Sequence, residues 1–289
     1  MRLLILGSRG QLGRELTARG ASAGHAITAV DIDECDITDP GAVDRWLTTS
    51  GAEAVINCAA WTRVDAAETE AEAAYRGNAI GPRVVAARCE TAGVLLTHVS
   101  TDFVFDGTAT EPIDEEATPN PLSVYGASKL AGEKEVRQGC RRHQVVRTAW
   151  LYGQDGPNFV LTILRLVREQ RPLRVVADQR GTPTWTGHLA PAILRLVELG
   201  VPGTYHLTNS GETSWHGFAE AVLAECGVDR PIDAITTADY PTPARRPAYS
   251  VLENRAWRRL GEPPLPDWRE GLRGYIAELA AADRLTSFR

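Results

Sequence analysis

A glycine-rich loop near the N-terminus constrains the fold more than any other feature. The letters GSRGQLG place Gly7, Gly10 and Gly13 directly after the apolar run LLIL and before a helical pattern over 11–20. Glycine permits a tight strand-to-helix turn and lets backbone N–H groups approach a pyrophosphate at the helix N-terminus. In this strand–loop–helix context, the glycine spacing predicts a dinucleotide-binding unit.

Strands and helices alternate through the first half of the chain. Apolar runs predict further strands at 26–30, 54–60, 95–100 and 144–150. Helical patterns lie between them, at 40–49, at 66–92 as two helices broken near Gly77–Asn78, and at 125–137. This alternation predicts βαβ units and an α/β fold, a Rossmann-type doubly wound parallel sheet.

The pattern changes after residue 152. Helices are predicted at 158–169, 188–199 and 215–226, with a strand at 203–208 and a proline-rich stretch at 241–252. We therefore expect a dinucleotide-binding domain over 1–152 and a smaller α+β domain over 153–289 that mainly binds substrate. Some later segments can return to the first domain.

Composition excludes several classes of protein. The 289 residues carry a formal net charge of −6, which argues against a nucleic-acid partner, since phosphate backbones demand a basic face. No apolar run approaches the roughly 20 residues that a membrane-spanning helix needs. The five cysteines are odd in number and contain no C-x-x-C. They predict neither a disulfide framework nor a zinc site, and they favour a reducing cytoplasm.

Charged residues near the glycine loop leave the choice of nicotinamide cofactor open. Asp31 ends the second strand, where an acidic residue usually accepts from the adenosine ribose and favours NADH. Arg9 lies inside the loop and could instead meet the 2′-phosphate of NADPH. Asp36 and Ile37 are further candidates, for contact with the adenine.

A second cluster forms where the fourth strand ends and the next helix begins. Thr101 and Asp102 follow that strand, at the sheet edge where open α/β folds bind ligands. Tyr125 and Lys129 are four residues apart, so they share one helix face. A lysine ammonium and a cationic nicotinamide would lower the pKa of the phenol toward useful acid–base chemistry. Together with the glycine loop, this order and spacing is the pattern of the extended short-chain dehydrogenases/reductases.

Segments along the whole chain resemble the dTDP-4-dehydrorhamnose reductase family. They are GSRGQLG, VINCAAWTRVDAAE, STDFVFDG, VYGASKLAGE, RTAWLYG, DQRGTPT, TSWHGFA and YPTPARRPAYSVL. The last three lie outside the cofactor half, so they point beyond the superfamily to this group. The resemblance implies NAD(P)H-dependent reduction of the 4-keto group of dTDP-4-dehydrorhamnose to dTDP-L-rhamnose.

The resemblance also implies roles for individual residues. Tyr125 would donate the proton, Lys129 would hold the ribose and support the tyrosine, and Thr101 would be the third catalytic group. Thr101, Asp102, Trp150 and Arg246 would contact the dTDP-sugar; a flat indole suits a sugar face, and a guanidinium suits a diphosphate. The cofactor contacts would be Gly7, Gly10, Gln11, Leu12, Gly13, Asp31, Asp36, Ile37, Ala59, Ala60, Thr62, Tyr125 and Lys129.

One departure from the family leaves the sugar open. After Thr-Asp the family commonly carries tyrosine, whereas this chain has Phe103. A related 4-ketoreductase acting on another dTDP-4-keto-deoxysugar of natural-product biosynthesis is therefore an alternative. Two further alternatives are an epimerase that retains its NAD and a non-catalytic regulatory subunit like the methionine adenosyltransferase β subunit. Some relatives are dimers bridged by Mg²⁺; the resemblance allows a homodimer, but no carboxylate cluster in the sequence supports the metal.

Overall fold

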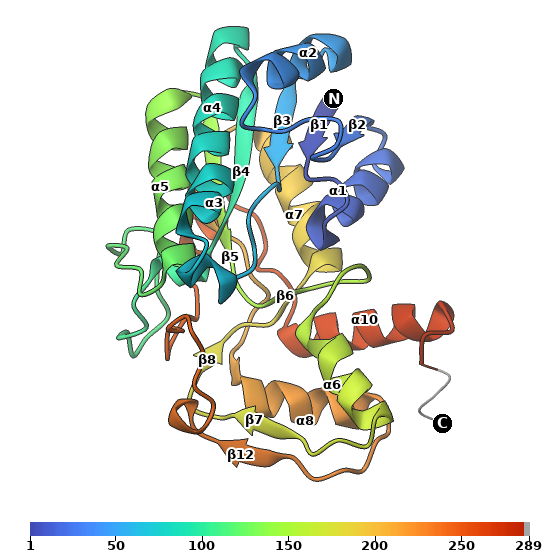
Figure 1. Cartoon of the computed structure of the whole chain (residues 1–289). Helices are drawn as coiled ribbons and strands as arrows, with labels where there is room; N and C mark the ends of the chain where they lie inside the picture. The colour runs from blue at the N-terminus through green and yellow to red at the C-terminus, as the bar shows by residue number, and fades with distance from the viewer. Residues whose placement is uncertain (286–289) are drawn as a thin grey trace.

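The chain forms two lobes, and the upper one is built on a central sheet (Figure 1). The computed structural model describes residues 1–285. The upper lobe holds a six-stranded sheet in the order β10-β5-β4-β3-β1-β2, with every neighbouring pair parallel. Its strands are β1 (Arg2–Leu6), β2 (Ala26–Val30), β3 (Ala54–Asn57), β4 (Leu95–Thr101), β5 (His143–Thr148) and β10 (Gly203–His206). The predicted Rossmann-type fold is confirmed.

Helices cover both faces of this sheet. One face carries α2 (Pro40–Ser50), α4 (Gly81–Ala92) and α5 (Val124–Gly139), and the other carries α1 (Gln11–Ser22) and α7 (Thr186–Leu199). Because both faces are buried, the strands are continuous apolar runs rather than alternating ones. Leu3 and Ile5 face the α1/α7 core, whereas Leu4 and Leu6 face the α2/α4 core.

The lower lobe has its own core beneath the carboxyl edge of the sheet (Figure 1). It packs Trp185, Phe218, Trp268 and Tyr275, all buried, between its helices. Those helices are α6 (Phe159–Arg168), α8 (Trp215–Glu225) and α10 (Trp268–Ala281), with the short α9 (Arg255–Arg259) nearer the sheet. Paired short strands complete the lobe: β6 (Leu151–Tyr152) with β9 (Thr184–Trp185), β7 (Arg174–Val176) with β12 (Asp233–Ile235), and β8 (Arg180–Gly181) with β11 (Thr213–Ser214).

Two segments differ from the sequence expectation. The break near Gly77–Asn78 is a π-helical turn, Arg76–Ile80, that joins α3 (Ala71–Tyr75) to α4 without a gap. The third strand stops at Asn57 because its side chain turns to accept from the Ala59 N–H at 3.1 Å. We propose that the lobes correspond to the predicted units 1–152 and 153–289, with α7 and β10 belonging to the first.

Candidate active site

The glycine loop is shaped for a close-approaching ligand. Gly7 has φ +77°, and a Cβ there would lie 2.5 Å from the Ala59 nitrogen. A Cβ on Gly13 would collide with the Gly7 carbonyl, so this turn cannot accept larger residues. Gly10 caps helix α1 without any side-chain hydrogen bond, which leaves the first N–H groups of the helix for an anion. This cradle fits the pyrophosphate of a dinucleotide.

The acidic residues beside the loop engage Arg9. Asp31 accepts from the Arg9 backbone N–H at 2.8 Å and from the Ile32 N–H at 2.8 Å. The Arg9 guanidinium is paired with Asp33 and Glu34, all three on the surface. Arg9 can therefore reach a 2′-phosphate only by leaving two carboxylates, a competition that the sequence analysis does not foresee.

The remaining predicted cofactor residues line the same sheet edge. Asp36 accepts from Thr38 at 2.7 Å and pairs with Arg76 at 3.2 Å. These hydrogen bonds and that ion pair outweigh burial, which acts in the opposite direction, and lower the pKa of Asp36. Ile37 is buried against Gly81 on α4, whereas Thr62 is exposed. Gln11, Leu12, Ala59 and Ala60 lie in or beside the loop.

Tyr125, Thr101 and Asp102 meet at the carboxyl end of β4, and all three are buried. The Ser123 side chain accepts from the Gly126 N–H at 3.1 Å and caps helix α5, so Tyr125 lies in its first turn. The Thr101 hydroxyl donates to Asp102 Oδ1 at 2.9 Å. Asp102 lies at the cavity, and its buried Oδ2 has no aligned hydrogen-bond partner, although the nearby Ser250 hydroxyl acts on this carboxyl group and opposes the rise in its pKa that burial causes.

Burial sets the protonation of these groups. It raises the pKa of Tyr125 to about 12, against a hydrogen bond with Thr101 and with help from the Asp102 charge. Burial likewise raises the pKa of Asp102 to about 6. The sequence predicts that Lys129 lowers the pKa of Tyr125. In the protein by itself, Lys129 has no such effect. A phenol that stays protonated at neutral pH is suited to donate a proton.

Lys129 lies one turn further along α5 and is also buried. Its ammonium donates to the Val99 carbonyl at 2.6 Å, which draws it toward the sheet rather than onto the phenol. Burial lowers the pKa of Lys129 to about 8, although Glu133 and Cys58 act in the opposite direction. Because its ammonium is poorly solvated, Lys129 would be stabilised by any hydrogen-bond acceptor on a ligand, such as a ribose hydroxyl.

A buried ion pair behind Lys129 was not predicted from the sequence. Glu133, fully buried on α5, accepts from Arg147 Nε at 2.9 Å and Nη2 at 2.7 Å, and from the Ser100 hydroxyl at 2.6 Å. This two-pronged pair fixes α5 against β4 and β5. Its signal in the sequence is faint: a glutamate four residues after Lys129, and one arginine inside an apolar strand.

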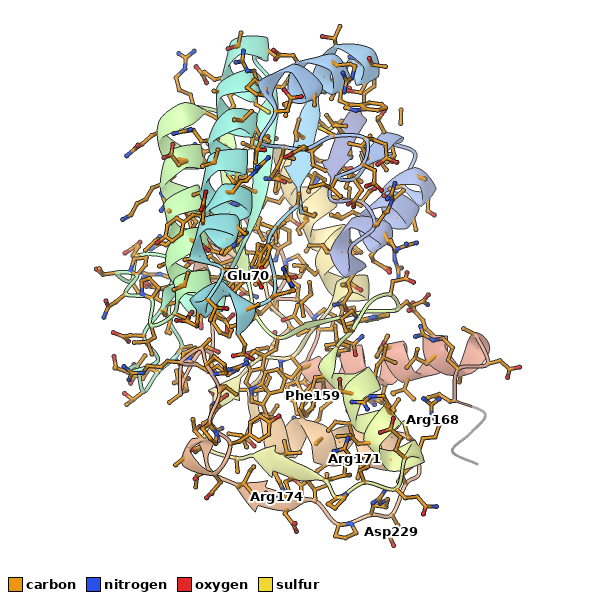
Figure 2. The ribbon with its side chains drawn as sticks, viewed as in Figure 1. Glu70, Phe159, Arg168, Arg171, Arg174 and Asp229 are labelled. Atoms are coloured by element: carbon orange, nitrogen blue, oxygen red, sulfur yellow. The ribbon has the colours of Figure 1, made fainter. Side chains whose placement is uncertain are left out.

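A cavity of about 680 Å³ opens between the lobes beside this cluster. Asp102, Phe103, Trp150 and Arg246 line it, as do Phe159, Arg171, Arg174, Gln179, Trp215 and Ser250, none of which was predicted. Figure 2 shows Phe159 at the upper end of α6, and Arg171 and Arg174 below it in the lower lobe. Phe103 touches Tyr125 edge-on, with ring centroids 5.4 Å apart. Three of the four predicted substrate residues, Asp102, Trp150 and Arg246, therefore face one volume, whereas Thr101 and Tyr125 lie behind Asp102 and Phe103.

Hydride transfer beside a buried tyrosine acid is the chemistry that this arrangement allows. The chain is accordingly an NAD(P)H-dependent oxidoreductase of the extended short-chain dehydrogenase/reductase class. Residues 1–281 match the model of the RmlD substrate binding domain, and the chain belongs to this family.

Named relatives cover nearly the whole chain. It is 43% identical over 286 residues to the dTDP-4-dehydrorhamnose reductase of Mycobacterium tuberculosis, covering 96% of this chain and 92% of the relative. It is 42% identical to a probable dTDP-4,6-dihydroxy-2-methyloxan-3-one 4-ketoreductase of Streptomyces antibioticus, covering 98% and 97%. A Bacillus anthracis dTDP-4-dehydrorhamnose reductase, solved in complex with NADP, superposes with a TM-score of 0.93 at 38% identity, covering 96% and 99%.

Proposed function

We propose that the protein reduces the 4-keto group of dTDP-4-dehydrorhamnose to give dTDP-L-rhamnose. The observation that carries the proposal is the buried Tyr125–Thr101–Asp102 cluster, whose Asp102 lines a cavity large enough for a nucleotide sugar. The relatives named as reductases of this sugar support the choice of substrate.

Four side chains would position the ligands and support the reduction of the carbonyl. When bound at the glycine loop, the reduced nicotinamide supplies the hydride. Tyr125 donates its proton to the C4 oxygen as negative charge develops there, and Thr101 orients the phenol. Lys129 would bind the nicotinamide ribose and stabilise the Tyr125 phenolate that forms when the proton is transferred. Asp102 Oδ2 would accept a hydroxyl of the sugar, because it is buried at the cavity and has no aligned hydrogen-bond partner.

The nucleotide end would lie deeper in the lower lobe. Arg171 and Arg174 line the cavity, and neither forms an ion pair within 4.0 Å among residues 1–285, although the charge of Arg174 helps to lower the pKa of Asp239. Arg246, the residue expected from the sequence, is already paired with Asp65 at 2.9 Å. The diphosphate would therefore bind Arg171 and Arg174 directly. It would bind Arg246 only if Arg246 gave up its ion pair with Asp65.

The direct test supplies purified protein with dTDP-4-dehydrorhamnose and either NADH or NADPH. Loss of the reduced cofactor should match the appearance of dTDP-L-rhamnose, identified by chromatography against the authentic compound. Absence of cofactor oxidation, with protein that binds NADH or NADPH normally, would refute the proposal.

A second function is favoured by Phe103 and by the Streptomyces antibioticus relative. Phe103 gives the cavity an apolar wall where the family commonly has a hydroxyl, which suits a sugar with fewer hydroxyl groups. The same assay with more deoxygenated dTDP-4-keto sugars separates the two functions by their ratio of kcat/KM.

A further inference from the structure

Two indole rings lie stacked in the wall of the cavity. The ring centroids of Trp150 and Trp215 are 3.5 Å apart, and their planes differ by 6°. Trp150 follows β5 in the upper lobe, whereas Trp215 is the first residue of α8 in the lower lobe. Phe159 packs tilted against Trp215, with ring centroids 4.7 Å apart. All three line the cavity, so an aromatic stack occupies the space beside the proposed acid.

The other face of Trp150 is closed by backbone. A Cβ on Gly181 would collide with the Trp150 ring at Cε2, Nε1 and Cζ2, so no ligand can enter on that side. Gly181 pairs with Thr213 in the β8–β11 ribbon, and Ser214 leads directly into Trp215. One short ribbon therefore covers Trp150 from both sides: Gly181 on one face and Trp215 on the other.

Of the two tryptophans, Trp150 is the more constrained, because Gly181 packs directly against its ring. Trp150 has a left-handed backbone, φ 47°, which a bulky residue adopts only where its surroundings impose it. Its carbonyl also accepts from the Thr184 N–H at 3.2 Å. Among residues 1–285, neither indole N–H has a hydrogen-bond partner, and the Trp215 ring is held by packing against Trp150, Phe159 and Phe218. A rotation of Trp215 about its side-chain bonds would expose the Trp150 face.

We propose that Trp215 occupies the place of the sugar ring in the free protein, so that the sugar must displace it to stack on Trp150. This inference rests on the proposed function, and it makes Trp215 a specificity-determining residue. A 6-deoxy sugar presents a methyl group and a more apolar face than a fully hydroxylated hexose. It therefore competes better with an indole for an aromatic surface. Trp215 thus selects deoxygenated sugars before any contact with the acid.

Binding measurements on Trp215→Ala test the proposal. Calorimetric titration with dTDP-L-rhamnose should give affinity about 3- to 10-fold tighter than wild type, because no ring stack has to be broken. Affinity for dTDP should be unchanged, because the nucleotide does not reach Trp150. Trp215→Leu repeats the measurement if the alanine variant does not fold. Trp46→Ala, on α2 away from the cavity, is the matched control and should leave both affinities unchanged.

Circular dichroism reports on the stack itself. Coupled indoles give a paired far-ultraviolet band, which dTDP-L-rhamnose should abolish in the wild type and which Trp215→Ala should lack. Weaker sugar binding by Trp215→Ala would overturn the proposal and make Trp215 a permanent wall of the sugar site. Equal affinity for the sugar, or a band that survives saturation, would also overturn it. Each of these leaves reduction of the keto sugar intact, whereas wild-type protein that binds no dTDP-sugar refutes the proposed function and the inference together.

Discussion

Arg246 and Asp65 close a two-pronged ion pair across the mouth of the cavity, although they are 181 residues apart in the chain. Nη1 donates to Oδ1 at 3.1 Å and Nη2 to Oδ2 at 2.9 Å. The Ala244 N–H adds a third hydrogen bond to Asp65. These hydrogen bonds from Arg246 lower the pKa of Asp65 despite its partial burial. Asp65 belongs to the cofactor lobe, so the pair joins both lobes beside the substrate.

Asp65→Asn should strengthen the binding of dTDP. The substitution removes the carboxylate that competes with a diphosphate for Arg246, and the amide oxygen can still accept from Ala244. Because a half-exposed ion pair contributes little, the expected gain is about 2- to 5-fold in Kd, measured by calorimetry. Asp44→Asn, which breaks a pair with Arg88 elsewhere, should change nothing. Weaker binding would mean that Asp65 positions Arg246 rather than competing for it.

Tyr125→Phe should abolish most of the turnover while leaving the cofactor bound. Loss of a general acid costs about 10²–10⁴-fold in kcat. The ring and its contact with Phe103 remain, so the Kd for NADPH should stay within a factor of about 2 of the wild type, since packing is conserved. Tyr75→Phe removes an exposed hydroxyl on α3 and is the matched control. Near-normal turnover in folded Tyr125→Phe protein would remove Tyr125 from the mechanism.

Part of the site could be predicted from the sequence, because residues close together in the chain determine it. Gly7 and Gly13 follow a strand and open a helix, and Tyr125 and Lys129 share a helix face. Thr101 ends a strand whose carboxyl edge must face the same side as the glycine loop. Each of these placements depends only on the period of an element and on the topology of a parallel sheet.

Long-range pairings could not be predicted in this way. The sequence alone indicates that Glu133 is a solvent-exposed helix residue. In the structure it is buried in an ion pair with Arg147 from a neighbouring strand. Trp215 reads as a residue of an amphipathic helix, and only the β8–β11 ribbon brings it onto Trp150. Arg246 lines the cavity, but its carboxylate partner comes from the other lobe. Such contacts depend on how the two lobes meet, which no local pattern encodes.

Lys129→Met should stabilise the fold near neutral pH and destroy activity. The pKa of Lys129 falls from 10.5 to about 8 on burial, so holding it as an ammonium opposes folding at every pH below 8. As pH rises from about 8 to 10.5, the folded protein releases this proton before the unfolded chain does, and the penalty disappears.

Urea unfolding at two pH values measures this effect. At pH 7 the variant should gain roughly 2–3 kcal/mol in free energy of unfolding, less a contribution for the Val99 carbonyl left without its donor. The difference from wild type should shrink between pH 8 and pH 10.5. A difference that does not change with pH would show that Lys129 is not buried as an ammonium.

The pairing of Arg9 with Asp33 and Glu34 should set the cofactor preference. In the wild type these two carboxylates pair with the Arg9 guanidinium, and Asp31 accepts from the Arg9 backbone N–H, so this negative charge should disfavour a 2′-phosphate and favour NADH. The double substitution Asp33→Asn with Glu34→Gln should raise the NADPH:NADH ratio of kcat/KM about 10-fold, because a freed Arg9 can bind the phosphate. Adding Arg9→Ala should cancel the gain. A ratio that stays constant across all three proteins would contradict the assignment.

Phe103→Tyr should shift sugar selectivity without altering the chemical step. Phe103 touches Tyr125 edge-on and lines the cavity, so a hydroxyl at the end of its ring would enter the sugar pocket beside the acid. A new hydrogen bond to a sugar hydroxyl should raise kcat/KM for dTDP-4-dehydrorhamnose about 3- to 10-fold relative to a more deoxygenated dTDP-4-keto sugar. Affinity for dTDP serves as the internal control and should not change. If the ratio for the two sugars is unaffected, the ring at this position does not reach the sugar, and the substrate must be selected elsewhere in the cavity.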